Sequence, residues 1–287
     1  MRDYSKPFGG KTREEQHAEN IEKLKVTRRI CSEGKYETDG RTVRITEVPE
    51  NTYIPRWELA PVPYNTEMEI AVLDGDSFGC VIEHQAEFDG KRALVLNFAN
   101  PFVPGGGVRK GSAAQEEDLC RRSNLLNALE DESASSYYED NYDERGFSSG
   151  FERCILTENV TVFVDSDGKM LSEPVVVDVL TAAAPKLDSN VPYLPGIEND
   201  EQPVYGTIDN ICEMILSVAE KYGYKILILG AFGCGAFKND PHDVAEAFKK
   251  SLTTKSFEKV YFPILRWSER GQRNFAVFTE VLERKDN

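Results

Sequence analysis

Short apolar segments alternate with longer segments of helical periodicity along much of the chain. Residues 93–98 form a nearly continuous apolar run, which is typical of a strand buried in a parallel sheet. Further strands are expected at residues 41–46, 68–73, 173–181, 226–229 and 260–265, the last of which would close the sheet. Strands separated by helices predict an α/β fold, with a mostly parallel sheet covered on both faces.

Helices are expected between these strands. Residues 207–222 carry apolar residues along one helical face, at Ile208, Ile211, Ile215 and Val218. A helix at residues 113–130 would face the core with three leucines, Leu119, Leu126 and Leu129. Pro241 is suited to the first turn of another helix. Residues 11–31 are charged and only loosely periodic, which predicts a helix packed on the outside.

The connections differ in character. Residues 160–164 and the Asp167-Gly168 turn predict a β-hairpin. The acidic, Ser- and Tyr-rich residues 131–150 predict an irregular surface segment. Residues 185–205 contain four prolines, and this connection is too long to serve only as a link between two elements of a compact domain.

Three consecutive glycines, Gly105, Gly106 and Gly107, follow the strand expected at residues 93–98. They lie where α/β folds bind ligands, beyond the carboxyl end of a strand. Without Cβ atoms they can adopt positive φ and bring backbone N–H groups close to a phosphorylated ligand. A glycine run is also typical of a flexible turn.

Paired carboxylates follow the glycines, at Glu116 and Glu117. Ser112 and Gln115 fit a capping box, which would start a helix at Ala113 and place both glutamates in its first turns. The glutamates could do proton chemistry on a bound sugar, or they could simply complement the positive end of the helix.

Five segments occur in a characteristic order: KTREE to GKY at 11–36, FANPFVPGGG at 98–107, QEE at 115–117, VLTAAAP at 179–185 and LGAFGCGAFKNDP at 229–241. Together they resemble the compact bacterial and fungal type of poly(ADP-ribose) glycohydrolase, which is built on a macrodomain. The resemblance covers roughly residues 10–265. It implies a three-layer α/β/α macrodomain-like fold, with a mixed, mostly parallel central sheet and an N-terminal helical extension.

The resemblance also implies catalytic and sugar-binding residues. Glu117 matches the general acid and base, Glu116 the residue that holds the ribose 2″-hydroxyl, and Asn100 a ligand of the distal ribose. Asp76, in a Gly-Asp turn, matches the residue that receives the adenine, although it could equally be the N-cap of the next helix. Gln115 would contact the ligand or serve only as the cap partner of Ser112.

Backbone groups would bind the rest of the ligand. The triple-glycine loop contributes Gly105, Gly106, Gly107 and Val108. The second glycine loop matches the backbone donors to a diphosphate, with a phenylalanine against the distal ribose: Gly233, Cys234, Gly235, Ala236 and Phe237. Cys234 could instead be a nucleophile, because nearby amide groups can lower a thiol pKa, but no histidine lies close to it in sequence.

The implied chemistry suits two glutamates. Cleavage of a ribose–ribose bond needs a carboxylic acid to protonate the leaving oxygen and a carboxylate to activate water. Neighbours on a helix point about 100° apart, so Glu116 and Glu117 cannot make the same contacts. Burial beside a second carboxylate would raise the pKa of one of them, whereas the helix N-terminus favours the charged form of both. Which glutamate has the raised pKa stays open at this point.

Composition agrees with a cytoplasmic, soluble enzyme. The net charge of −15 disfavours DNA or RNA binding. The six cysteines form no C-x-x-C pair, which indicates reduced thiols, and no spacing suits zinc, so we expect neither metal nor cofactor. No signal or membrane segment stands out. With no repeats or composition break, we expect one macrodomain-type catalytic domain over 1–287, with 1–60 as an accessory segment packed on it.

Three functions fit this pattern. The first is hydrolysis of poly(ADP-ribose), free or attached to modified proteins, by a monomeric enzyme. The second is a mono-ADP-ribosyl hydrolase, which would need the same loops. The third is a non-catalytic ADP-ribose-binding macrodomain, against which the intact glutamate pair argues.

Overall fold

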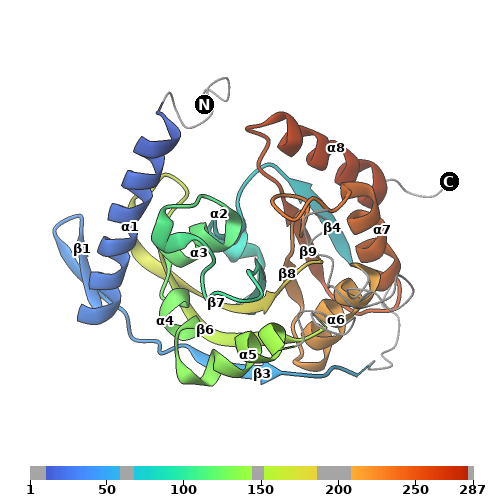
Figure 1. Ribbon diagram of the computed structural model, residues 1–287, viewed down its shortest axis with the longest axis horizontal. Helices are drawn as coiled ribbons and strands as arrows, with labels where there is room; N and C mark the ends of the chain where they lie inside the picture. Colours follow the sequence, from blue (N-terminus) through green and yellow to red (C-terminus); the bar gives the residue numbers. More distant parts are fainter. Residues whose placement is uncertain (1–10, 59–67, 144–151, 186–207, 284–287) are drawn as a thin grey trace, which may run out of the picture.

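A seven-stranded sheet with the order β3-β6-β7-β5-β8-β9-β4 forms the centre of the protein (Figure 1). The computed structural model describes residues 11–58, 68–143, 152–185 and 208–283. The strands of this sheet are β3 (Glu50–Ile54), β4 (Glu69–Leu73), β5 (Ala93–Phe98), β6 (Cys154–Val164), β7 (Met170–Ala182), β8 (Ile226–Ile228) and β9 (Lys259–Pro263). Strand β6 is antiparallel to both neighbours and all other pairs are parallel, so the expected mixed, mostly parallel sheet is confirmed.

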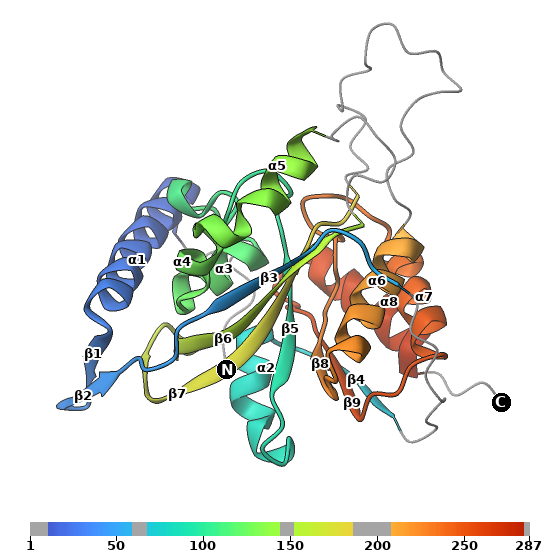
Figure 2. The same ribbon diagram turned by 90° about the horizontal axis from the view of Figure 1, so that it is seen from below.

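Helices cover both faces, which confirms the three-layer α/β/α fold (Figures 1 and 2). One face buries apolar side chains of α6 (Ile208–Lys221), α7 (Pro241–Leu252) and α8 (Glu269–Glu283). The other buries side chains of α1 (Arg13–Glu33), α2 (Ser77–His84), α3 (Gln115–Arg122), α4 (Leu125–Leu129) and α5 (Ser135–Asp143). Short 3-10 turns lie at η2 (Gln85–Glu87), η3 (Val108–Lys110) and η4 (Glu132–Ala134).

The N-terminal segment combines a helix, a hairpin and a strand of the main sheet. Helix α1 begins with a complete capping box between Thr12 and Glu15 and ends at Gly34 in the left-handed conformation. A two-stranded sheet follows, formed by β1 (Lys35–Thr38) and β2 (Arg41–Arg44), and Tyr36 Oη donates a hydrogen bond to Leu171 O of β7 at 2.6 Å. Strand β3 then pairs with β6 at the sheet edge. The division into domains stays a prediction.

One expectation about the sheet edges needs correction, and two elements were not expected. The strand expected at 260–265 exists as β9, but it does not close the sheet, because β4 pairs with its outer side. Helix α8, which the apolar pattern did not indicate, follows β9 and packs Phe278 into the core. Strand β3 was not expected either, since only Ile54 of its five residues is buried.

The helix expected at 113–130 is interrupted. The chain leaves helical geometry at Ser123, which forms a β-bridge to Val162, and Asn124 Oδ1 accepts a hydrogen bond from Thr161 N at 2.8 Å. Pairing with β6 therefore replaces the helical hydrogen bonds there, leaving α3 and α4 as separate helices. The connection from β6 to β7 is the expected hairpin, with Gly168 at φ 83° in its turn.

The irregular segment expected at 131–150 is wrong over its first part. Helix α5 lies there, and its Tyr137 is fully buried with Tyr138 packed against it in a T-shaped contact, ring centroids 5.0 Å apart. Two tyrosines that appear suited to a polar surface thus fill the core beside α3 and α4. Residues 144–151, and almost all of the long connection expected at 185–205, lie outside the described residues.

Candidate active site

The triple-glycine loop closes over the two glutamates. Gly105 and Gly106 both have positive φ, at 68° and 55°. A Cβ on Gly106 would lie 2.8 Å from Glu116 Oε2 and 2.9 Å from Glu117 Oε1, so only glycine lets the backbone approach the carboxylates this closely. A Cβ on Gly105 would instead meet the buried Leu126 Cδ1 at 2.6 Å.

Glu116 is held on both oxygens. Its side chain is buried, with 2% of its surface exposed. Oε2 accepts a hydrogen bond from Asn100 N at 2.8 Å, and Oε1 lies 3.4 Å from Asn97 Nδ2. Burial, with the charge of Glu117 as a further cause, raises the pKa of Glu116 to about 8 although these donors oppose the shift. This raised pKa favours the protonated form of Glu116 at neutral pH.

Glu117 is also buried, but its hydrogen bonding is incomplete. Its exposed fraction is 7%, and its Oε1 accepts a hydrogen bond from Gly107 N at 2.8 Å. Oε2 has no hydrogen-bond partner in the described part of the chain. A buried carboxylate oxygen without a partner is costly unless a ligand or water completes it. The adjacent glutamates thus make different contacts, and Glu117 keeps one oxygen for a ligand.

The capping box predicted from Ser112 and Gln115 is wrong. The helix starts at Gln115, and Ala114 is its N-cap without a side-chain bond. Gln115 Nε2 donates to Leu96 O at 2.7 Å and to Ser77 Oγ at 3.1 Å, while its Oε1 accepts from Phe98 N at 2.9 Å. The amide therefore ties α3 to β5 and α2.

Asn100 and Val108 shape the loop from within. Asn100 Oδ1 accepts hydrogen bonds from Phe102 N at 2.9 Å and Val103 N at 3.1 Å. Val108 is fully buried in the core, so its side chain cannot face a ligand. Any ligand contact of these residues comes from Asn100 Nδ2 or from the backbone, and their binding roles stay predictions.

The second glycine loop follows β8, which is the parallel neighbour of β5, so both loops leave the same edge of the sheet. Gly233 has φ 73°, and a Cβ there would overlap Ala184 Cβ and Asn239 Nδ2, both at 2.6 Å. Gly235 is exposed, and a Cβ on it would point into open space. Ala236 is exposed and Phe237 half-buried.

Cys234 is a poor nucleophile in this setting. Its side chain is buried and its Sγ donates to Phe232 O at 3.5 Å. Burial, followed by the charge of Asp240, raises the pKa of the thiol to about 12. The amide groups of the loop do not offset this, so the alternative of a thiolate nucleophile is disfavoured.

Comparison with known proteins adds family information to this geometry. The family model of the catalytic domain of microbial-type PARG matches residues 25–165, which include both glutamates and the triple-glycine loop. Solved structures of poly(ADP-ribose) glycohydrolase (PARG) from Thermomonospora curvata match with 26% identity and a TM-score of 0.76, covering 92% of this chain and 100% of that chain. Over these residues the chain is similar to the microbial-type PARG family.

Ligand-bound PARG structures match as well. T. curvata PARG bound to the inhibitor ADP-HPD has 26% identity, a TM-score of 0.74, and covers 92% of this chain and 99% of that chain. Deinococcus radiodurans PARG in complex with ADP-ribose has 26% identity, a TM-score of 0.65, and covers 94% of this chain and 92% of that chain. No curated protein matches this chain at a significant level.

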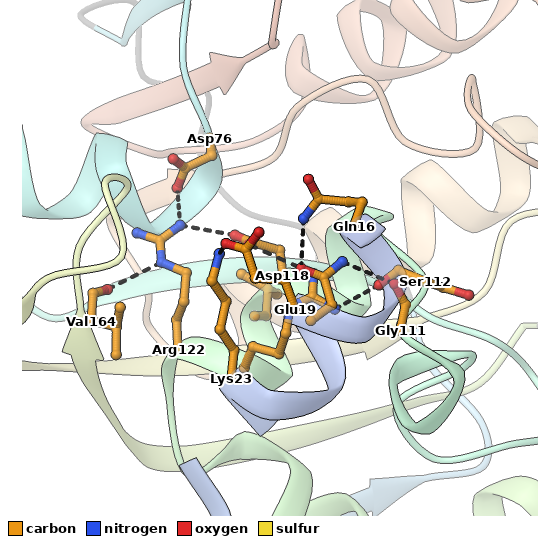
Figure 3. Close-up of polar contacts among 12 residues, drawn as sticks. Gln16, Glu19, Lys23, Asp76, Gly111, Ser112, Asp118, Arg122 and Val164 are labelled. Atoms are coloured by element: carbon orange, nitrogen blue, oxygen red, sulfur yellow. Dashed lines mark hydrogen bonds and ion pairs between the residues drawn. The ribbon is translucent and has the colours of Figure 1, made fainter. Parts of the chain in front are cut away.

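Asp76 is the N-cap of α2, which was one of its two expected roles. Its Oδ1 accepts from Gly79 N at 2.7 Å and from Arg122 Nη1 at 2.6 Å (Figure 3). Burial alone would raise the pKa of Asp76, but the Arg122 charge and a hydrogen bond from Ser166 hold it below the usual value. Adenine binding at this carboxyl stays a prediction.

Two residues of this site were not indicated by the sequence. Asn97, fully buried in β5, contacts Glu116 and Thr181 Oγ1, the latter at 3.2 Å. Its signal was a lone polar side chain inside an apolar run. Arg122 is buried and bonds Asp76, Asp118 and Val164 O (Figure 3). The sequence did not reveal this role, because two of the three partners, Asp76 and Val164, lie more than forty residues away.

The described ranges of the chain contain no group of three or more His, Cys, Asp or Glu residues arranged to hold a metal ion. In the same ranges, no helix combines the length and the apolar character that crossing a bilayer requires.

Proposed function

We propose that the protein hydrolyses ribose–ribose O-glycosidic bonds of poly(ADP-ribose) and releases ADP-ribose, with Glu117 as general acid and base. The observation that carries this assignment is the asymmetry of the buried pair. Both oxygens of Glu116 face protein donors, whereas Glu117 Oε2 has no partner in the described residues. A leaving-group oxygen placed at Oε2 would meet the one carboxyl oxygen of the pair that is free to exchange a proton.

The proton of the pair has to reach Glu117 before it can act as an acid. In the unliganded protein the raised pKa places a proton on Glu116. A ribose hydroxyl that donates a hydrogen bond to Glu116 favours its charged form, and the proton then moves to the neighbouring carboxyl. Glu117 protonates the leaving oxygen, becomes a carboxylate, and activates the attacking water. In this proposal, substrate binding thus leaves Glu117 protonated and ready to act as the general acid.

The two loops suit the extended shape of ADP-ribose. We expect the distal ribose under the triple-glycine loop after β5, and the diphosphate on the backbone of residues 233–237 after β8, the parallel neighbour of β5. A net charge of −15 gives no general attraction for a polyanion, so local donors must bind the diphosphate. Arg270 and Arg273 flank this loop, at Gly235 O (3.1 Å) and Asp240 (2.9 Å). The substrate is the polymer, free or attached to protein; we expect a monomer that does not bind nucleic acid.

Product analysis with two defined substrates tests the proposal. The wild-type protein should release ADP-ribose from purified poly(ADP-ribose) and act more slowly on a singly ADP-ribosylated protein. Glu117→Gln keeps the size of the side chain but removes the acid, so turnover should fall by roughly 10²–10⁴-fold. ADP-ribose affinity, measured by calorimetry, should survive in this variant.

Three outcomes would contradict the assignment. Wild-type activity on the singly modified protein alone would replace polymer hydrolysis by the mono-ADP-ribosyl activity. Binding without turnover on either substrate would identify a binding domain. Comparable turnover of Glu117→Gln and wild type would move the acid to another residue.

A further inference from the structure

Helix α1 lies directly against the end of the triple-glycine loop. The loop continues from Gly107 through η3 to Gly111, just before Ser112. Gly111 has φ 78°, and a Cβ on it would lie 2.3 Å from His17 O. The backbones of α1 and the loop therefore approach as closely as glycine allows. Figure 3 shows α1, with Gln16 and Glu19, beside Gly111 and Ser112.

Asn20 connects the two backbones at this contact. The side chain is buried, with 3% exposed, and its Nδ2 donates to Gly111 O at 2.9 Å. Its Oδ1 accepts from Gln16 Nε2 at 3.0 Å, one turn earlier on α1. Since both polar atoms are used, the amide is fixed in the orientation that donates to the loop. In the absence of Asn20, Gly111 O would be a buried carbonyl without this donor.

The contact at Gly111 is relayed to Glu117 through the tight turn of the loop. Lys110 N donates to Gly107 O at 2.9 Å, and Ser112 N donates to the same oxygen at 3.2 Å. Gly107 N, on the other side of that residue, donates to Glu117 Oε1. A shift of residues 110–112 would therefore also move Gly107 N, the backbone donor that orients Glu117 within the described residues.

A second path between α1 and the loop is weaker. Arg28 of α1 forms an ion pair with Glu130, which also pairs with Arg109 of the loop, and Arg109 Nη1 donates to Pro104 O at 3.0 Å. The side chains of Arg28 and Arg109 are 36% and 45% exposed. Solvent weakens ion pairs between exposed side chains, so this path cannot replace a buried hydrogen bond.

We propose that Asn20 is a positioning residue for catalysis, which holds the triple-glycine loop in the geometry that presents Glu117 to the glycosidic bond. The proposal rests on the proposed role of Glu117. It assigns to the N-terminal helix a part in turnover in addition to its packing. Loss of the contact displaces the acid without removing any group that touches the ligand.

The test compares Asn20→Ala with Thr27→Val. Thr27 is a matched control because it is also 3% exposed on α1 and also donates to a backbone oxygen, that of Arg121 on α3. Only Asn20 bonds the loop. We expect kcat on poly(ADP-ribose) to fall by on the order of 10- to 100-fold in Asn20→Ala, because small misplacements of catalytic groups have effects of this size. KM and ADP-ribose affinity should stay within about threefold, and Thr27→Val should keep the wild-type kcat.

A variant and a second measurement keep the test decisive. Asn20→Leu fills the same volume but donates nothing, so it should match Asn20→Ala in kcat even if the alanine variant folds poorly. Hydrogen exchange of residues 105–112 should accelerate in both Asn20 variants and not in Thr27→Val. Unchanged kcat in both Asn20 variants, or an equal fall in Thr27→Val, would overturn the proposal. If the wild type does not cleave the polymer, the proposed function itself fails, whereas the exchange measurement still reports on the loop.

Discussion

Replacement of Glu116 by glutamine should change how stability depends on pH. The folded protein holds the Glu116 proton up to a pKa of about 8, whereas an unfolded glutamate loses it near pH 4.5. Between these two values the folded state binds more protons than the unfolded state, so wild-type stability falls as pH rises. The slope for one proton is about 1.4 kcal/mol per pH unit, which amounts to about 3 kcal/mol at pH 7.

Glutamine cannot ionise, so Glu116→Gln removes this loss of stability with rising pH. Its new NH₂ group can be accommodated, because Asn97 Oδ1 has no partner in the described residues and can rotate to accept from it. Any remaining cost is independent of pH. The free energy of unfolding of the variant relative to wild type should thus rise from pH 5 to pH 8 and stay level above it.

Urea denaturation followed by tryptophan fluorescence, at each pH from 5 to 9, measures this difference. Glu117→Gln is an informative companion, because the Glu117 charge contributes to the raised pKa of Glu116. Without the Glu117 charge the pKa of Glu116 should be lower. The decline of the free energy of unfolding with pH should therefore end at a lower pH than in the wild type. Parallel stability curves for wild type and Glu116→Gln would refute the argument, since they would show that Glu116 titrates alike in both states.

Four further predictions concern the second glycine loop and metal dependence. Gly235→Val should abolish ADP-ribose binding in calorimetry. The Tm of this variant should be unchanged, because a side chain at position 235 points into open space. Gly233→Ala should instead lower the Tm, because its Cβ would overlap Ala184 and Asn239. Cys234→Ser should retain turnover within a few-fold, because only its backbone is used; an inactive serine variant beside an active Glu117→Gln would reassign the chemistry to the thiol. Activity should persist in excess chelator, since the described residues lack a metal-binding cluster, and strict dependence on added Mg²⁺ would contradict this.

Much of the sheet could be predicted, and so could the part of the site formed by the triple glycine and the glutamate pair, because their sequence signals are local. The run that became β5 and the glycines after it are contiguous in sequence, and so are Glu116 and Glu117. What failed depends on distant partners: Gln115 bonds Leu96 and Ser77 rather than capping its own helix. The contact of Asn20 spans 91 residues and therefore leaves no trace in a local pattern.

The same limit applies to the α3–α4 region and α5. The break at Ser123 comes from pairing with β6, whose sequence lies some forty residues further on, so helical periodicity across 113–130 could not reveal it. Tyr137 reads as a surface residue among acidic neighbours and becomes buried only where α5 packs beside α3 and α4. Polar composition predicts exposure only when the whole segment faces solvent.

The adjacent left-handed glycines have a consequence for natural sequence variation. Side chains are excluded at the two positions for different reasons: at Gly105 by Leu126 of the core, and at Gly106 by the carboxylates themselves. Substitutions at Gly105 should therefore appear in a cell as reduced protein abundance. Substitutions at Gly106 should leave more of the protein present but inactive. Two glycines that look equivalent in an alignment would then separate into one that maintains the amount of enzyme and one that maintains its chemistry.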